Sequence, residues 1–139
     1  MNPASVLIVE DDTKLRHALK EIMTREGYAV DATESGDTAV SMIKDTVYDL
    51  VISDLKLPGI DGMDVLRSVQ KLARDTSVII VTAYATVDTA VEAMKEGAED
   101  YIAKPFNLEE IRLVVRKVLD KKALVDDNRF LRNQLKKKY

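Results

Sequence analysis

The sequence contains no cysteine and only one histidine, His17, among its 139 residues. Without cysteine the chain has no disulfide, no thiolate zinc site and no cysteine nucleophile. With a single histidine it has no multi-histidine metal site either. Any metal site in this chain must therefore use oxygen ligands, which bind hard cations such as Mg²⁺.

Long apolar runs are missing as well. No stretch approaches the roughly 20 apolar residues that a membrane span needs, and the N-terminus lacks the pattern of an export signal. The net charge of -3 gives no general attraction to nucleic acid, and the basic cluster at 136–138 is typical of a solvated helix end. We therefore expect a cytoplasmic protein that contacts neither membrane nor nucleic acid directly.

Short apolar runs of strand length alternate with segments whose apolar residues recur at helical spacing. This alternation predicts βαβ units in a doubly wound α/β domain with a five-stranded parallel sheet. We expect strands near residues 5–10, 28–33, 49–53, 77–81 and 100–103, each followed by a helix. The last helix should begin at Asn107 and continue to about residue 137, which is longer than a small domain is wide.

Charged and hydroxyl side chains follow four of these runs. They are Glu10, Asp11 and Asp12 after the first run, Asp54 after the third, Thr82 after the fourth and Lys104 after the fifth. The carboxyl ends of parallel strands meet at one edge of a sheet, where open α/β folds bind ligands, so these side chains should converge.

Four carboxylates gathered at one edge would repel one another. Two like charges about 4 Å apart repel by roughly 4 kcal/mol at a protein surface, so such a cluster raises its pKa values or recruits a cation. We expect Mg²⁺. Acidic residues are also favoured at a helix N-terminus, which would account for Asp12 and even Asp11 but not for Asp54.

Asp54 follows an apolar strand beside the expected metal, which is where a nucleophilic carboxylate is best held. Phosphoryl transfer needs mainly positioning and charge neutralisation, and these can come from Mg²⁺, the Lys104 ammonium and the Thr82 hydroxyl. The product would be an aspartyl phosphate. This chemistry is that of a switch rather than an enzyme: the chain would promote only its own phosphorylation and dephosphorylation.

The motifs Glu10-Asp11-Asp12, 54–62, Thr82-Ala83 and Lys104-Pro105-Phe106 resemble the receiver domain of two-component response regulators over about residues 5–120. The resemblance implies a flavodoxin-like sheet of order 2-1-3-4-5. It also implies a sensor histidine kinase as phosphodonor and an output module, most often in transcription, as target.

Carried over by position, the resemblance assigns a role to each motif residue. Asp54 would be the phosphoacceptor, and Thr82 and Lys104 would bind the phosphoryl oxygens. Asp11 would bind Mg²⁺ directly, Glu10 through water, and Lys56 through its backbone carbonyl, with Asp12 as a further candidate. A cis peptide would precede Pro105. Tyr101 would be the switch aromatic that follows Thr82. Apart from the resemblance, Tyr84 lies close to Thr82 in the sequence and could gate access to Asp54 or simply shield it.

The second half of the last helix has the 4-3-4 spacing of a coiled-coil seam, at Leu124, Asn128, Leu131 and Leu135. We therefore divide the chain into a receiver domain at 1–120 and a helical linker at 121–139 that forms a homodimer. The run 82–86 and this helix also resemble the nitrogen-regulation (NtrC-like) class of transcription activators. Members of that class carry an ATPase and a DNA-binding domain, which are absent from this chain.

Three alternatives remain open at this point. The chain is either a receiver-plus-linker fragment of a larger activator or a stand-alone receiver with a dimerising tail. A receiver-like module that binds partners without being phosphorylated is the rival from another functional class. The sequence also leaves open whether phosphorylation forms or breaks the dimer.

Overall fold

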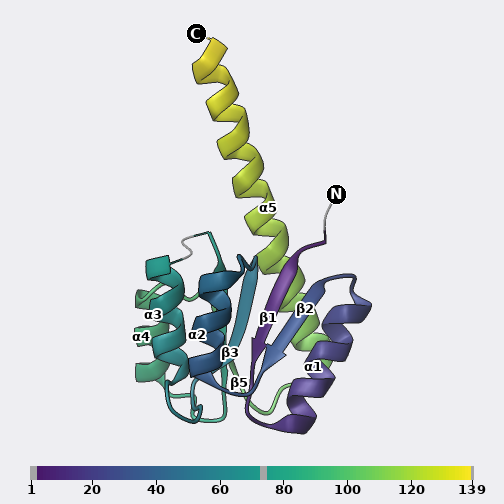
Figure 1. Cartoon of the computed structure of the whole chain (residues 1–139), viewed down its shortest axis with the longest axis vertical. Coiled ribbons are helices and arrows are strands. Elements are labelled where there is room, and N and C mark those ends of the chain that lie inside the picture. The colour runs from purple at the N-terminus through teal and green to yellow at the C-terminus, as the bar shows by residue number, and fades with distance from the viewer. Residues whose placement is uncertain (1–2, 73–74, 139) are drawn as a thin grey trace.

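The computed structural model describes residues 3–72 and 75–138, with side chains up to residue 135, so the side chains of the basic cluster at 136–138 lie outside the described part. Five strands and five helices alternate along the chain (Figure 1). The strands are β1 Ser5–Val9, β2 Ala29–Thr33, β3 Leu50–Asp54, β4 Ser77–Thr82 and β5 Asp100–Ala103. The helices are α1 Thr13–Arg25, α2 Gly36–Asp45, α3 Gly62–Leu72, α4 Val87–Lys95 and α5 Leu108–Lys138.

All five strands are parallel, and their order is β2-β1-β3-β4-β5, as the resemblance implies. Helices α2, α3 and α4 cover one face of this sheet, and α1 and α5 cover the other (Figure 1). In β1 the side chains of Leu7 and Val9 enter the first core and those of Val6 and Ile8 the second. Burial on both faces explains why the central strands are continuous apolar runs.

Side chains that accept hydrogen bonds set the starts of the helices. Asp12 Oδ1 accepts from the Leu15 amide at 3.1 Å, and Ser35 and Thr86 cap α2 and α4 in the same way. The side chain of Asn107 accepts from the Glu110 amide at 2.7 Å, at the start of α5 expected from the sequence. Such caps satisfy amides that have no partner within the helix.

Helix α5 is continuous for 31 residues and projects well beyond the sheet (Figure 1). Its first turns bury Ile111, Val115 and Val118 against the sheet, whereas Leu108 is 37% exposed and does not join this buried set. No helix among the described residues is both long and apolar enough to cross a membrane.

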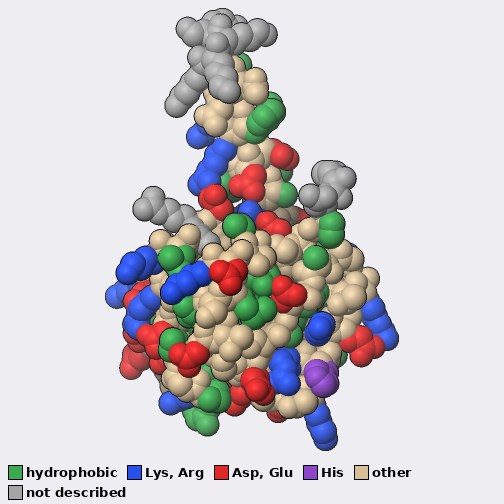
Figure 2. Space-filling view, viewed as in Figure 1, with side chains coloured by type: hydrophobic (Ala, Val, Ile, Leu, Met, Phe, Trp, Pro, Cys, Tyr) green, Lys and Arg blue, Asp and Glu red, His purple; other side chains and the backbone are tan. Residues whose placement is uncertain are grey.

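The part of α5 beyond the sheet is held by ion pairs. Lys122 Nζ lies 3.5 Å from Asp49, and Arg129 Nη1 lies 3.2 Å from Asp75. The leucines of the predicted seam are solvent-exposed on this single chain, with Leu124 at 66%, Leu131 at 59% and Leu135 at 57%. Figure 2 shows the projecting helix with hydrophobic and charged side chains at its surface.

Candidate functional site

The register of the sheet brings the predicted site residues to one edge. Val9 pairs with Ser53, Asp54 with Val81, and Thr82 with Ala103. The residues that follow Val9 and Ala103 are Glu10 and Lys104. The four adjacent strands β1, β3, β4 and β5 therefore end side by side in a carboxylate, a carboxylate, a hydroxyl and an ammonium. The convergence expected from the sequence is therefore present, and it is a consequence of the strand pairing.

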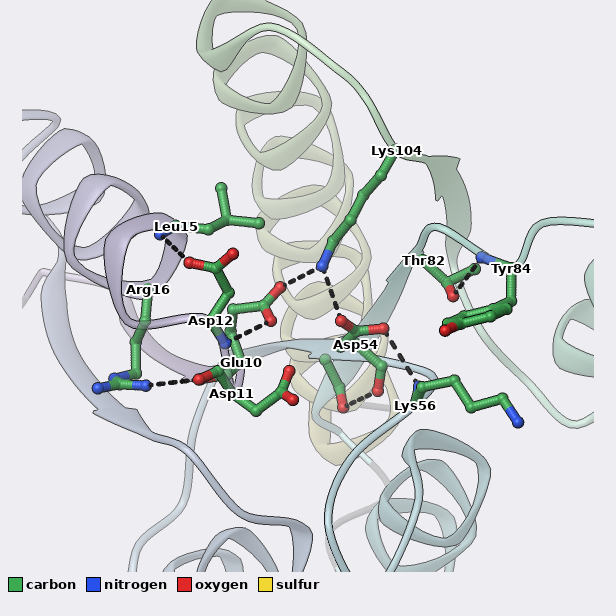
Figure 3. A network of polar contacts seen from close by, with 11 residues as sticks. Glu10, Asp11, Asp12, Leu15, Arg16, Asp54, Lys56, Thr82, Tyr84 and Lys104 are labelled. Atoms are coloured by element: carbon green, nitrogen blue, oxygen red, sulfur yellow. Dashed lines mark hydrogen bonds and ion pairs between the residues drawn. The ribbon is translucent and has the colours of Figure 1, made fainter.

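Lys104 joins two of these carboxylates (Figure 3). Its Nζ donates to Asp54 Oδ2 at 2.7 Å and to Glu10 Oε1 at 2.6 Å. All three side chains are largely buried, at 17% exposed for Lys104, 8% for Asp54 and 3% for Glu10. Burial disfavours the charge on Lys104, but its hydrogen bonds to Asp54 and Glu10 outweigh this effect and raise the pKa of the ammonium.

Glu10 is the most deeply buried acid of the site. Burial raises the pKa of its carboxyl group, and the nearby charge of Asp54 raises it further. The hydrogen bonds from Lys104 and from the Asp12 amide, the latter at 3.1 Å to Oε2, act in the opposite direction. Burial outweighs these hydrogen bonds, so the pKa of the Glu10 carboxyl group stays above its ordinary value.

Carboxylate oxygens of Glu10, Asp11 and Asp54 lie within 4.8 Å of one another. Their three negative charges against the single charge of Lys104 leave an excess that a divalent cation would neutralise. Asp11 is exposed while the other two are buried, so one side of the group is open to water. Mg²⁺ uses few carboxylates and keeps several waters, and this all-oxygen, half-open donor set fits it.

Asp12 lies outside this group of carboxylates in the described part of the chain. Its side chain is exposed and is engaged as the N-cap of α1 through the Leu15 amide (Figure 3). The structure thus gives Asp12 the helix-terminal role that we weighed against metal binding. Contact of Asp12 with a metal or its waters stays a prediction.

The other carboxylate oxygen of Asp54 is also held. Asp54 Oδ1 accepts a hydrogen bond from the backbone amide of Lys56 at 3.2 Å. The Lys56 side chain extends away from the carboxylates, and its Nζ lies 5.3 Å from the centre of the Tyr84 ring (Figure 3). Lys56 therefore touches the site through its backbone amide. Metal binding by its backbone carbonyl stays a prediction.

Thr82 is fully buried, and its hydroxyl oxygen accepts from the Tyr84 amide at 3.0 Å. The Tyr84 ring beside it is 61% exposed. Tyr101 is half-buried, and its hydroxyl lies 2.6 Å from the hydroxyl of Thr89 in α4. The Lys104–Pro105 peptide bond is cis, as the resemblance implies.

Two polar partners of the site were not found by sequence reasoning. Arg16 Nη1 donates to the Glu10 carbonyl at 3.0 Å and supports the acidic segment from α1. Thr89 links Tyr101 to the cap of α4. Arg16 could have been found from the sequence, because it lies in the first turn of the helix that follows the acidic segment. Nothing in the sequence near Thr89 or Tyr101 indicates that their side chains meet.

An apolar hollow of about 330 Å³ adjoins Lys104, lined by Leu15, Ala83, Lys104, Pro105 and Phe106. This hollow lies between the first turn of α1 and the segment that follows β5. The charged pocket is thus bordered by an apolar surface.

Residues 6–116 match the family described as the response regulator receiver domain. Regulatory protein AtoC of Escherichia coli is 35% identical over 130 residues, which cover 94% of this chain and 28% of AtoC. Sporulation initiation phosphotransferase F of Bacillus subtilis is 36% identical over 118 residues, which cover 85% of this chain and 95% of that protein.

Among solved structures, NtrX of Brucella abortus aligns with a TM-score of 0.86 at 29% identity, covering 93% of this chain and 29% of NtrX. The chain therefore spans less than a third of AtoC and of NtrX, but nearly all of the sporulation protein.

Proposed function

Because this chain belongs to the response regulator receiver domain family, we propose that it is switched by a phosphoryl group that Asp54 accepts from a sensor histidine kinase. A receiver is a phosphoacceptor signalling switch, and regulators of transcription are among its relatives. What the proposal adds is the assignment of the individual residues. The observation that carries it is the Lys104 ammonium between Asp54 and Glu10.

Asp54 is the nucleophile in this proposal. One carboxylate oxygen attacks the phosphorus of the phosphohistidine, the new O–P bond forms, and the P–N bond breaks as the imidazole leaves. Lys104, already 2.7 Å from Oδ2, neutralises a phosphoryl oxygen, and the Thr82 hydroxyl donates to another. Water later attacks the phosphorus, the O–P bond to Asp54 breaks, inorganic phosphate leaves and the carboxylate is free again.

Mg²⁺, held by Glu10, Asp11, Asp54 and the Lys56 carbonyl, supplies charge neutralisation at the phosphoryl group when it is bound. The excess of negative charge in the pocket supports its presence. Without a bound cation, Lys104 offsets part of this charge through its ion pairs with Glu10 and Asp54. It therefore has to exchange a carboxylate oxygen for a phosphoryl oxygen during the reaction.

The test is incubation with acetyl phosphate and Mg²⁺, followed by mass spectrometry of the intact protein. The wild type should gain one phosphoryl group, and Asp54→Asn should gain none, because an amide oxygen is too weak a nucleophile. Asp45→Asn, the same change at the far end of α2, is the matched control and should be phosphorylated like the wild type.

A module that only binds partners would take up no phosphoryl group in either form, and that result would contradict the proposal. Turnover of added phosphoesters without retained phosphate would indicate a hydrolase instead. A phosphoryl group gained by Asp54→Asn would show that another residue is the phosphoacceptor.

The switch proper involves Tyr101. When Thr82 moves toward the phosphoryl group, Tyr101 fills the space behind it and changes the surface formed by α4, β5 and α5. The 2.6 Å contact between the hydroxyls of Tyr101 and Thr89 supports this proposal, because it ties the ring to α4 before phosphorylation. Tyr84, exposed beside Thr82, either gates access to Asp54 or shields it.

We further propose that residues 1–120 form the receiver and residues 121–139 a helical linker that pairs with a second copy. The exposed leucines at 124, 131 and 135 support pairing, because they form an apolar stripe on a helix that projects from the domain. AtoC and NtrX are NtrC-like and much longer than this chain, which supports an attached ATPase and DNA-binding module acting in cytoplasmic transcription control.

A further inference from the structure

The start of α2 lies against the loop that follows Asp54. Gly36, the first residue of α2, is buried. A Cβ atom at this position would lie 2.1 Å from the carbonyl oxygen of Ile60 and 2.9 Å from its carbonyl carbon. These are backbone atoms, so they cannot rotate away as the end of a flexible side chain does. Only glycine allows α2 and the loop at 55–61 to approach this closely.

The neighbouring residues make a second contact. Gly59 has a φ of 73°, and a Cβ atom there would lie 2.4 Å from Oδ2 of Asp37. Two consecutive residues of the loop, Gly59 and Ile60, therefore meet two consecutive residues of α2. Helices α2 and α3 lie side by side on this face of the sheet, with the loop at their common end (Figure 1).

The other end of the loop is closed on Asp54 itself. The Gly62 amide donates to the Leu55 carbonyl at 2.8 Å, and a Cβ atom at Gly62 would lie 2.1 Å from the Asp54 carbonyl oxygen. Leu55 is buried. The short loop is thus held at both ends, and it has little freedom to absorb a displacement at Ile60.

Lys56 lies between these two anchors. Its amide holds Asp54 Oδ1 at 3.2 Å, and in the proposed function its carbonyl is one of the Mg²⁺ ligands. A shift of Ile60 away from α2 is therefore passed to the backbone atoms that position the phosphoacceptor and the metal. The distance from Ile60 to Lys56 is only four residues along a closed loop.

We infer that Gly36 is a positioning residue of the acidic pocket: the first turn of α2 holds the loop at 55–61 in place and so sets the affinity for Mg²⁺. This inference rests on the proposed phosphorylation of Asp54. It adds a residue that lies outside the pocket and touches neither metal nor phosphate. It also makes α2 a part of the site that the strand ends alone do not reveal.

The test is Gly36→Ala, measured by calorimetric Mg²⁺ titration and by phosphorylation rate. Disturbed support of a metal ligand typically weakens metal affinity about 10–100-fold, and we expect a loss of at least about 10-fold here. Phosphorylation should be slow at limiting Mg²⁺ and recover at saturating Mg²⁺, because Asp54, Thr82 and Lys104 are unchanged. A purely structural role for Gly36 would not produce this dependence on Mg²⁺ concentration.

Gly27→Ala is the matched control. Gly27 has a φ of 92° but nothing lies within 4 Å of a Cβ atom there, so the change strains the backbone without touching the loop. It should lower the melting temperature and leave the Mg²⁺ affinity as in the wild type. Wild-type affinity in Gly36→Ala would overturn the inference, as would an equal loss of affinity in Gly27→Ala.

A second measurement covers the case in which Gly36→Ala does not fold. In the wild type, the amide resonances of Gly36 and Asp37 should move on addition of Mg²⁺, whereas that of Gly27 should not. Unmoved Gly36 and Asp37 resonances in a protein that binds Mg²⁺ overturn this inference alone. A wild type that binds no Mg²⁺ and accepts no phosphoryl group overturns the proposed function as well.

Discussion

At the scale of single residues, the pocket depends on unequal numbers of charges. Lys104 pairs with both Glu10 and Asp54, so each carboxylate has only a share of one ammonium. A buried ion pair is stabilising only when its geometry is good and its remaining atoms are satisfied. Here the three carboxylates of Glu10, Asp11 and Asp54 carry more charge than the one ammonium, so the pocket attracts a cation. The arrangement favours cation binding rather than the stability of the fold.

Sequence reasoning placed Glu10, Asp54, Thr82 and Lys104 at one edge of the sheet because each directly follows an apolar run, with Asp11 one residue further on. Their roles in phosphoryl transfer stay predictions. Sequence reasoning did not resolve Asp12, whose carboxylate could serve a metal or a helix end, and the structure engages it at the helix end. The two uses differ by a rotation of the side chain, which depends on where α1 begins relative to the strand. That geometry is not encoded in the spacing of the residues.

Tyr48 gives a prediction at this scale. Its ring is 3% exposed, and its hydroxyl donates to Asp31 at 2.6 Å. Burial and the contact with Asp31 raise the pKa of Tyr48 from 10 to about 12. The folded state therefore keeps this proton longer than the unfolded state, so the stability it contributes is complete below about pH 10 and is lost as the pH rises toward 12.

In Tyr48→Phe, the loss of stability at high pH that the Tyr48 hydroxyl causes should be absent. The free energy of unfolding of the wild type should fall more steeply above about pH 10 than that of the variant, by about 1.4 kcal/mol per pH unit. Urea unfolding at several alkaline pH values measures the difference, with neutral pH as the reference. An equal slope in both proteins would show that the phenol does not titrate differently on folding.

At the scale of elements, the single helix α5 has two halves in different surroundings. Its first half is buried against the sheet, and its second half leaves the domain with exposed leucines. The sequence indicated both halves through the change in apolar spacing. The projecting half continues the axis of the buried half, and its Lys122 and Arg129 also form ion pairs with Asp49 and Asp75 from distant parts of the chain.

Asn128→Lys tests the proposed pairing of the linker. An asparagine at a seam position tolerates a facing asparagine, whereas two facing lysines repel, so self-association should weaken at least about 10-fold with phosphorylation unchanged. Asn133→Lys is the matched control: at 100° per residue it lies about 140° around the helix from Asn128, and it should leave self-association intact.

Sedimentation velocity of the wild type and both variants reads out this prediction. An unchanged profile in Asn128→Lys, or in a chain truncated at Lys121, would count against the pairing. Equal weakening by both lysine variants would point to a general effect of added charge rather than to a seam.

At the scale of the whole molecule, the pocket joins segments that are far apart in the chain. Glu10 and Lys104 are 94 residues apart and meet at 2.6 Å. A cation in this pocket therefore links the ends of the central strands, and such binding stabilises the folded state against the unfolded one. The stabilisation is about 2.7 kcal/mol when the free ligand is at 100 times its dissociation constant.

Saturating Mg²⁺ should accordingly raise the melting temperature by roughly 6–10 °C, since 1 kcal/mol corresponds to about 2–4 °C in a chain of this size. The rise should be reversed by a chelator and be much smaller in Asp11→Asn, which loses one of the three carboxylates. Scanning calorimetry at constant ionic strength separates specific binding of Mg²⁺ from the general screening of charges by salt. An equal rise with NaCl, or in Asp11→Asn, would contradict specific binding.

The fold class and the chemical types of the side chains at the site follow from the amino-acid sequence alone. Alternating apolar periodicities dictate βαβ units, and the ends of parallel strands have to meet at one edge. The tertiary structure decided the register that places Lys104 between Glu10 and Asp54, the backbone contact between Gly36 and Ile60, and the link between Thr89 and Tyr101. The reason is physical: periodicity specifies which face of an element is buried, whereas contacts between distant side chains depend on how the finished elements pack.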